Sequence, residues 1–222
     1  MIFRTTIAVG TLALFIILMT GWFELVSVEP YYLLLLPLLT SFFHLTVSPF
    51  LRVTGIYKYL SPMLLVNLPT KHHYELHNGT SFDYLINIHR LKKYGIKKVL
   101  LTDYLKGLLN VISEIQNGEL PGNVVIKGSS YFFSHRSAKR FGFTLERPSF
   151  FSKMNAMLNY LDLFWMYSLA NKKWAAPNLK MMKTASVKGE VLAKKREVIE
   201  KLLNRIEKTE VKSMPTKGQV RQ

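Results

Sequence analysis

TTIAVGTLALFIILMTGWF, residues 5–23, is an apolar run of 19 residues without a single charge. About 20 apolar helical residues cross the hydrocarbon core of a bilayer. Trp22 and Phe23 at its end suit the boundary between lipid and water. We therefore expect a membrane-spanning helix over residues 5–23. The alternative is a cleaved signal peptide beginning with Arg4, but residues 20–24 contain no small-x-small cleavage site.

A second apolar run, YYLLLLPLLTSFFHLTVSPFL, occupies residues 31–51 and also lacks Lys, Arg, Asp and Glu. Its prolines, Pro37 and Pro49, lie near its two ends, where the loss of a backbone hydrogen bond costs little. Because only a short elbow separates the two runs, we expect a two-helix transmembrane hairpin over residues 1–52. Within it, His44 either bonds locally to a backbone carbonyl or to the first helix, or it faces a cavity or a neighbouring helix.

Charge is divided sharply along the chain. Of the 30 Lys and Arg and 14 Asp and Glu, only Arg4, Glu24 and Glu29 precede residue 52, so residues 52–222 carry a net charge of +17. The positive-inside rule then predicts a multi-pass membrane protein with both termini in the cytoplasm and the elbow outside. An anionic leaflet attracts each nearby Lys or Arg by about 1 kcal/mol, which makes an anionic phospholipid surface the expected partner. Nucleic acid is disfavoured because the basic residues are scattered and form no reading motif.

The rest of the chain predicts a membrane-anchored α+β fold, or a small α/β fold, in one basic cytoplasmic domain over residues 71–208. Residues 53–70 are expected to form a juxtamembrane linker, whose apolar part is either interfacial or the first strand, and residues 209–222 a disordered tail. Hydrophobic periodicity and turn signals predict strands at 72–77, 124–127 and 184–188, and helices at 99–115, 137–141 and 190–208. Ser134 is the expected N-cap of the helix at 137–141.

Residues 149–170 form an aromatic, methionine-rich segment that is long enough to span a bilayer. Asp162 argues against a span, because a charge at the helix centre costs about 2.5–3.5 kcal/mol on insertion scales. Lys172 and Lys173 follow it directly. We expect an amphipathic helix that lies in the interface or docks on the domain. A third span is the alternative, and it would place the basic tail outside.

The densest polar cluster surrounds His77 and Asp83. His77 could act as a general base and Asp83 as the carboxylate that orients it, with hydroxyl groups from a turn between two strands beside them. The simpler interpretation is a turn whose polar side chains satisfy backbone groups. A metal held by His73 and His77 is a further alternative, but no third ligand has a recognised spacing, and we expect neither a metal nor a cofactor.

A second cluster offers Ser130, His135 and Arg136. Small residues after a strand and cations at a helix start could hold a phosphate through backbone amides and Arg136. The segment lacks the order of glycine, lysine and hydroxyl that defines a P-loop, and ordinary strand-to-helix turn chemistry is the alternative. The absence of Cys from the whole chain excludes disulfides and thiol nucleophiles.

These patterns favour an integral membrane protein whose basic domain packs on the inner leaflet as an accessory or interaction module. The alternative is a membrane-bound transferase or hydrolase for a phosphate-bearing lipid or lipid-linked substrate. That enzyme would require His77 and Asp83 to lie beside Ser130, His135 and Arg136. A third hypothesis is a subunit of a larger complex, with a membrane-protein partner bound through the hairpin and His44.

Overall fold

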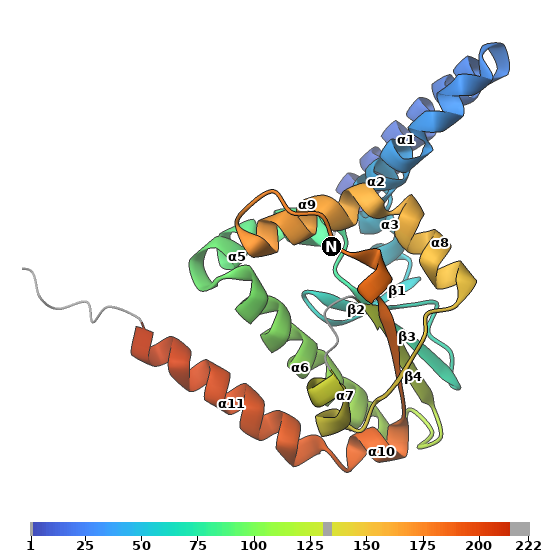
Figure 1. Ribbon diagram of the computed structural model, residues 1–222. Helices are drawn as coiled ribbons and strands as arrows, with labels where there is room; N and C mark the ends of the chain where they lie inside the picture. The colour runs from blue at the N-terminus through green and yellow to red at the C-terminus, as the bar shows by residue number, and fades with distance from the viewer. Residues whose placement is uncertain (1, 131–134, 214–222) are drawn as a thin grey trace, which may run out of the picture.

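The computed structural model describes residues 2–130 and 135–213 of the 222-residue chain. Its first element is α1 (Ile2–Val28), a long helix that projects from the rest of the molecule (Figure 1). Among the described residues, Ala8–Val28 is the one helical segment long and apolar enough to cross a membrane. Only 6% of its apolar window is buried, so α1 is not a core helix of the folded domain. The span predicted over residues 5–23 therefore coincides with a helix of spanning length.

The second apolar run is divided into three short pieces. They are the 3-10 helix η1 (Pro30–Leu35) and the helices α2 (Leu36–Thr46) and α3 (Ser48–Val53). Proline starts η1 and lies in the first turn of both α2 and α3, where a missing N–H group is tolerated. The apolar stretch Pro30–Thr46 is shorter than a span requires. The second span predicted over residues 31–51 is not confirmed.

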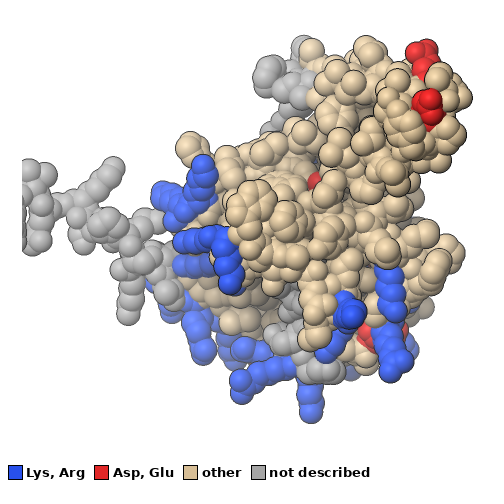
Figure 2. Space-filling view, turned by 45° about the horizontal axis from the view of Figure 1, so that its top comes forward, with Lys and Arg blue, Asp and Glu red and all other residues tan. Residues whose placement is uncertain are grey.

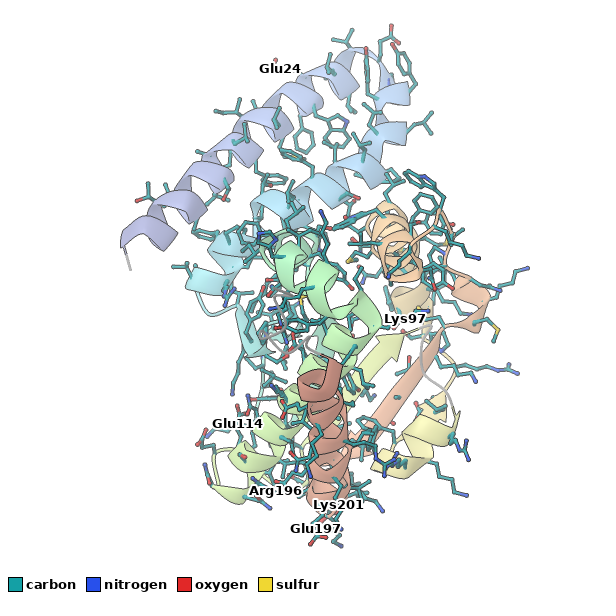
Figure 3. The ribbon with its side chains drawn as sticks, turned by 90° about the vertical axis from the view of Figure 1, so that its left-hand side faces the viewer. Glu24, Lys97, Glu114, Arg196, Glu197 and Lys201 are labelled. Carbon is teal, nitrogen blue, oxygen red and sulfur yellow. The ribbon has the colours of Figure 1, made fainter. Side chains whose placement is uncertain are left out.

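The pieces of the second run fold back along α1 (Figures 1 and 3). The indole nitrogen of Trp22 donates a hydrogen bond to the Tyr32 carbonyl at 3.1 Å, and the rings of Phe15 and Phe43 meet edge to face with centroids 5.2 Å apart. These contacts pack η1 and α2 against α1. We treat η1 and α2 as one returning arm and call α1 and this arm the helix pair.

A six-stranded mixed sheet organises residues 57–213, which we call the mixed domain. Its strand order is β1-β2-β3-β4-β6-β5. Only β3 and β4 are parallel, and the helices between them supply the crossover that parallel strands need. The strands are β1 (Tyr57–Ser61), β2 (Leu64–Asn67), β3 (His73–Asn78), β4 (Val125–Ser130), β5 (Thr144–Glu146) and β6 (Lys183–Lys188). The segment 53–70, expected as a linker or first strand, thus contains two strands of the sheet.

The main core lies on one face of this sheet. Apolar residues alternate along β3 and β6, so Tyr74, Leu76, Ala185 and Val187 face the same side. They pack against the 21-residue amphipathic helix α6 (Ile96–Gln116) and against α7 (His135–Phe141), α10 (Gly189–Ala193) and α11 (Arg196–Ser213). The opposite face carries polar side chains, which leaves it available for a site.

A second, smaller core joins α4 (Ser81–Ile86), α5 (Ile88–Tyr94) and the start of α6 to the aromatic segment. That segment is not one helix: it divides at Asn159 into α8 (Phe150–Leu158) and α9 (Tyr160–Asn171). Residues of α9, including Ala170 and Trp165, pack into the second core, whereas α8 exposes its phenylalanines. Residues 149–170 were expected either to lie in the interface or to dock on the domain. Docking is found for α9 but not for α8.

The predicted C-terminal elements differ from the structure in their bounds by a few residues. The helix expected at 190–208 is two helices, α10 and α11, and α11 continues to Ser213, so residues 209–213 are helical rather than part of a tail. A 3-10 turn, η2 (Leu179–Met181), precedes β6. The expected N-cap Ser134 and the tail after residue 213 lie outside the described residues.

Candidate functional site

A cavity of about 360 Å³ lies where the helix pair meets the mixed domain. Its wall comes from the end of α2, the strands β1 to β4, the start of α4, and both α8 and α9. The polar groups that matter for its chemistry are His44, Glu75, His77, Ser81, Asn159 and Asp162. Eight separate elements therefore converge on one chamber.

His77 lines this cavity because β3 alternates. Its neighbours Tyr74 and Leu76 point into the main core, so His77 and Glu75 point to the opposite face. Burial is the main cause that lowers the pKa of His77, and His44 lowers it further, while the Glu75 carboxylate opposes both. The nearest Glu75 oxygen is 3.9 Å from His77 Nε2, and no described residue bonds that nitrogen. The ring is neutral at pH 7 and has an unsatisfied polar atom.

Asp162 and Ser81 form the buried end of the cavity. Ser81 Oγ donates to Asp162 Oδ1 at 2.6 Å, and the indole nitrogen of Trp165 donates to Ser81 Oγ at 3.2 Å. Asp162 is only 4% exposed and also interacts electrostatically with His44. These bonds join α4 to α9 across 81 residues of sequence. The Ser81 hydroxyl donates to a carboxylate rather than to a histidine, so Ser81 does not form a Ser–His pair.

The cavity is lined without any lysine or arginine among the described residues, although the chain contains 30 of them. It contains instead the carboxylates of Glu75 and Asp162 and the buried side-chain oxygen of Asn159, which lies near His44. An anion would meet negative charge here without compensation. The chamber therefore suits a neutral hydroxyl or amide group, or a cation, better than a phosphate.

Asp83, the predicted partner of His77, caps the start of α4 instead. It is 1% exposed and closes a capping box at the start of α4, accepting from the Thr80 N–H at 2.7 Å and from Thr80 Oγ1 at 3.0 Å. Tyr59 Oη donates to the same carboxylate at 2.8 Å, and Arg52 stacks over the Tyr59 ring. Burial raises the pKa of Asp83 against these hydrogen bonds. Asp83 does not line the cavity and does not orient His77.

The second predicted cluster is not part of this cavity either. Arg136 is exposed on α7, whose Ala138 and Phe141 pack into the main core on the face of the sheet opposite to His77. Ser130 ends β4, next to Ser129 on the cavity wall, and His135 begins α7; their side chains lie outside the described set. Among the described side chains, His77 and Arg136 are not brought together, so these two residues do not form the joint site that the enzyme hypothesis needs.

Ser81, one of the turn hydroxyls of the predicted His77 cluster, pairs with a residue that the sequence analysis did not assign to a site. That residue is Asp162, which was considered only as an obstacle to membrane insertion. A lone carboxylate in an otherwise apolar segment was the available signal, because such a group must find a polar partner when buried. Within residues 2–130 and 135–213 no group of three His, Asp or Glu side chains could hold a metal ion.

Comparison of the chain with protein-family models, curated proteins and solved structures gives no match. The function is therefore inferred from the surfaces and cavities of this molecule.

Proposed function

We propose that this protein is a membrane-anchored interaction module whose mixed domain rests on the anionic inner leaflet. In this proposal α1 spans the bilayer, the rest of the helix pair returns beside it, and α8 lies in the interface. The cavity then opens at the base of the anchor, close to the headgroups, where it can bind a polar group of a partner or an amphiphile.

The observation that carries this proposal is the exposed apolar surface of α8. Phe150 is 74% exposed, Phe151 is 73% exposed and Met157 is 67% exposed, and Trp174 after α9 is 84% exposed. Soluble proteins rarely leave aromatic side chains bare together, and such surfaces mark contacts with membranes or proteins. Because α8 lies beside the base of the helix pair (Figure 1), a membrane around α1 would lie near these side chains.

The distribution of charge supports the same placement. Figure 2 shows acidic side chains at the tip of the helix pair and Lys and Arg over the mixed domain, with neutral surface between them. In Figure 3 Glu24 lies at the far end of α1 from Arg196 and Lys201. A polarity of this kind matches the positive-inside rule and an anionic inner leaflet.

The depth of α8 can be measured directly because the chain contains no cysteine. Single spin labels at Phe151→Cys and Met157→Cys, in the full chain reconstituted in phosphatidylglycerol-containing liposomes, would report contact with oxygen or with a water-soluble nickel chelate. We expect both sites to favour oxygen, which concentrates in lipid.

Lys201→Cys on the exposed face of α11 is the matched control and should favour the nickel chelate. If labels at positions 151 and 157 are as accessible to nickel as the label at 201, α8 does not lie in the interface and the proposal fails.

A further inference from the structure

Beside the first cavity lies a second, open groove of about 810 Å³ with the opposite charge. We call it the basic groove and define it by Arg147, Lys153, Lys180 and Lys183, with apolar walls from Leu145, Met157, Leu179 and Met182. Ala156 and Met182 separate it from the first cavity, since both residues line the two spaces.

The four cations of the basic groove come from separate elements. Arg147 follows β5, Lys153 is on α8, Lys180 is in η2 and Lys183 starts β6. None of them forms an ion pair within the described part of the chain. The one carboxylate on the groove, Glu146, accepts a hydrogen bond from Ser186 at 3.3 Å. Four like charges on one surface repel each other, and a bound anion would relieve that repulsion.

The apolar wall of the groove continues onto the surface of α8 that we place in the interface. Met157 belongs to both, and Phe150 and Phe151 begin the same helix. A ligand that satisfies the whole groove must combine an anionic group with hydrocarbon. A soluble phosphate would leave the exposed methionine and phenylalanine side chains in water, whereas a lipid would cover them.

We propose that the basic groove binds the phosphate head group of an anionic glycerophospholipid, with the acyl chains leaving along Met157 and α8 into the leaflet. This inference rests on the proposed function, because it assumes that the groove faces the bilayer. In this assignment the anionic group binds in the basic groove. The adjoining cavity has no lysine or arginine among its described lining residues and is left for a non-anionic group.

The test is a calorimetric titration of the full chain in neutral maltoside micelles with dihexanoyl phosphatidylglycerol. The groove variant is Arg147→Gln with Lys153→Gln and Lys183→Gln. The control variant removes three charges from exposed positions on α11 and on the turn before it, as Lys194→Gln with Lys201→Gln and Lys208→Gln. We expect binding to weaken about tenfold or more in the groove variant and less than about twofold in the control, since charge-assisted contacts to phosphate are lost only in the former.

Dihexanoyl phosphatidylcholine and inorganic phosphate serve as comparison ligands, and both should bind more weakly than phosphatidylglycerol. An equal loss in the two triple variants would show attraction by general charge alone and would overturn the inference. Binding of inorganic phosphate as tight as that of the lipid would overturn its lipid source. If the groove variant fails to fold, the single variant Lys180→Gln replaces it, with a smaller loss expected against Lys201→Gln. Since the titration needs no bilayer, its result is independent of the depth of α8, which the spin labels measure.

Discussion

The imidazole of His77 shows how one half-buried side chain makes the fold sensitive to acid. Burial lowers its pKa below the ordinary value of 6.5, and the facing groups are Glu75 on the same strand and His44 from α2. The unfolded chain therefore binds the proton at a higher pH than the folded chain. The stability that the neutral ring contributes is complete above pH 6.5 and is lost as the pH falls from 6.5 through the lower folded pKa. We expect the melting temperature of the full chain to fall over this window.

The measurement is a series of thermal melts between pH 7.5 and 5 in neutral micelles, compared between wild type and His77→Gln. The variant should lose part of the slope because its side chain does not titrate. His89→Gln removes an exposed histidine and is the control variant. Identical slopes in wild type and His77→Gln would show that His77 titrates alike in both states.

Asp83 illustrates a residue whose role is structural although its setting resembles a catalytic one. Asp83→Ala leaves the Thr80 N–H, the Thr80 hydroxyl and the Tyr59 hydroxyl without their shared acceptor. Losing a buried acceptor of this kind costs about 1–3 kcal/mol. We expect the free energy of unfolding to drop by about that amount in urea titrations. Glu75→Ala, at a half-exposed carboxylate, is the control with little expected change. A stable Asp83→Ala protein would contradict the capping role.

At the scale of elements, the close approach of α10 to the end of α6 depends on a glycine. A Cβ atom at Gly189 would lie 2.7 Å from Val124 Cγ1, 2.8 Å from Ile115 Cδ1 and 3.1 Å from the Gly122 carbonyl oxygen. Gly189→Ala should therefore destabilise the domain by about 1–3 kcal/mol through overpacking. Gly122→Ala is the control, because its Cβ would meet only Glu190 Cβ at 3.7 Å. Urea titrations of both variants measure the difference, and equal stabilities would show that α10 can shift freely.

Elements with a strong local pattern were predictable, and elements whose limits depend on partners were not. The strand at His73–Asn78, the strand at Lys183–Lys188 and helix α6 lie within a few residues of their predicted ranges, because alternation and three- to four-residue spacing reflect a single buried face. The turn after β3 was expected to lead into another strand but leads into α4. The Thr80-x-x-Asp83 capping box was the local sign of that helix.

The candidate site was predictable only in part, for a reason of distance along the chain. His77 was recognised from its own segment, but its surroundings come from α2, α4 and α9. The bond between Ser81 and Asp162 joins residues 81 positions apart, and no local pattern specifies such a pair. The division of residues 149–170 at Asn159 likewise follows from docking α9 on the second core while α8 stays exposed.

For the whole molecule, two arrangements in the membrane are compared: a crossing by α1 alone, and crossings by α1 and the second run. α1 has spanning length, whereas Pro30–Thr46 alone is shorter and would need a thinned bilayer or the added length of α3. The two arrangements differ in where the elbow lies. With two spans, Glu29 and Lys201 are on opposite sides; with α1 as the only span, both are on the same side. We propose two spans, an arrangement consistent with the packing of the second run against α1 through Trp22, Phe15 and Phe43.

We therefore expect opposite labelling of Glu29→Cys and Lys201→Cys by a membrane-impermeant maleimide. In a chain that has no native cysteine, each variant carries one unique thiol. Glu29→Cys should react in intact cells, and Lys201→Cys only after the membrane is permeabilised, because in our proposal the Lys and Arg of residues 52–222 keep the mixed domain inside. The Lys201 side chain is largely exposed, so its replacement leaves the fold intact. Labelling of both thiols under the same condition would reduce the anchor to α1 alone, and labelling of Lys201→Cys in intact cells would reverse the orientation and remove the inner leaflet as the partner surface.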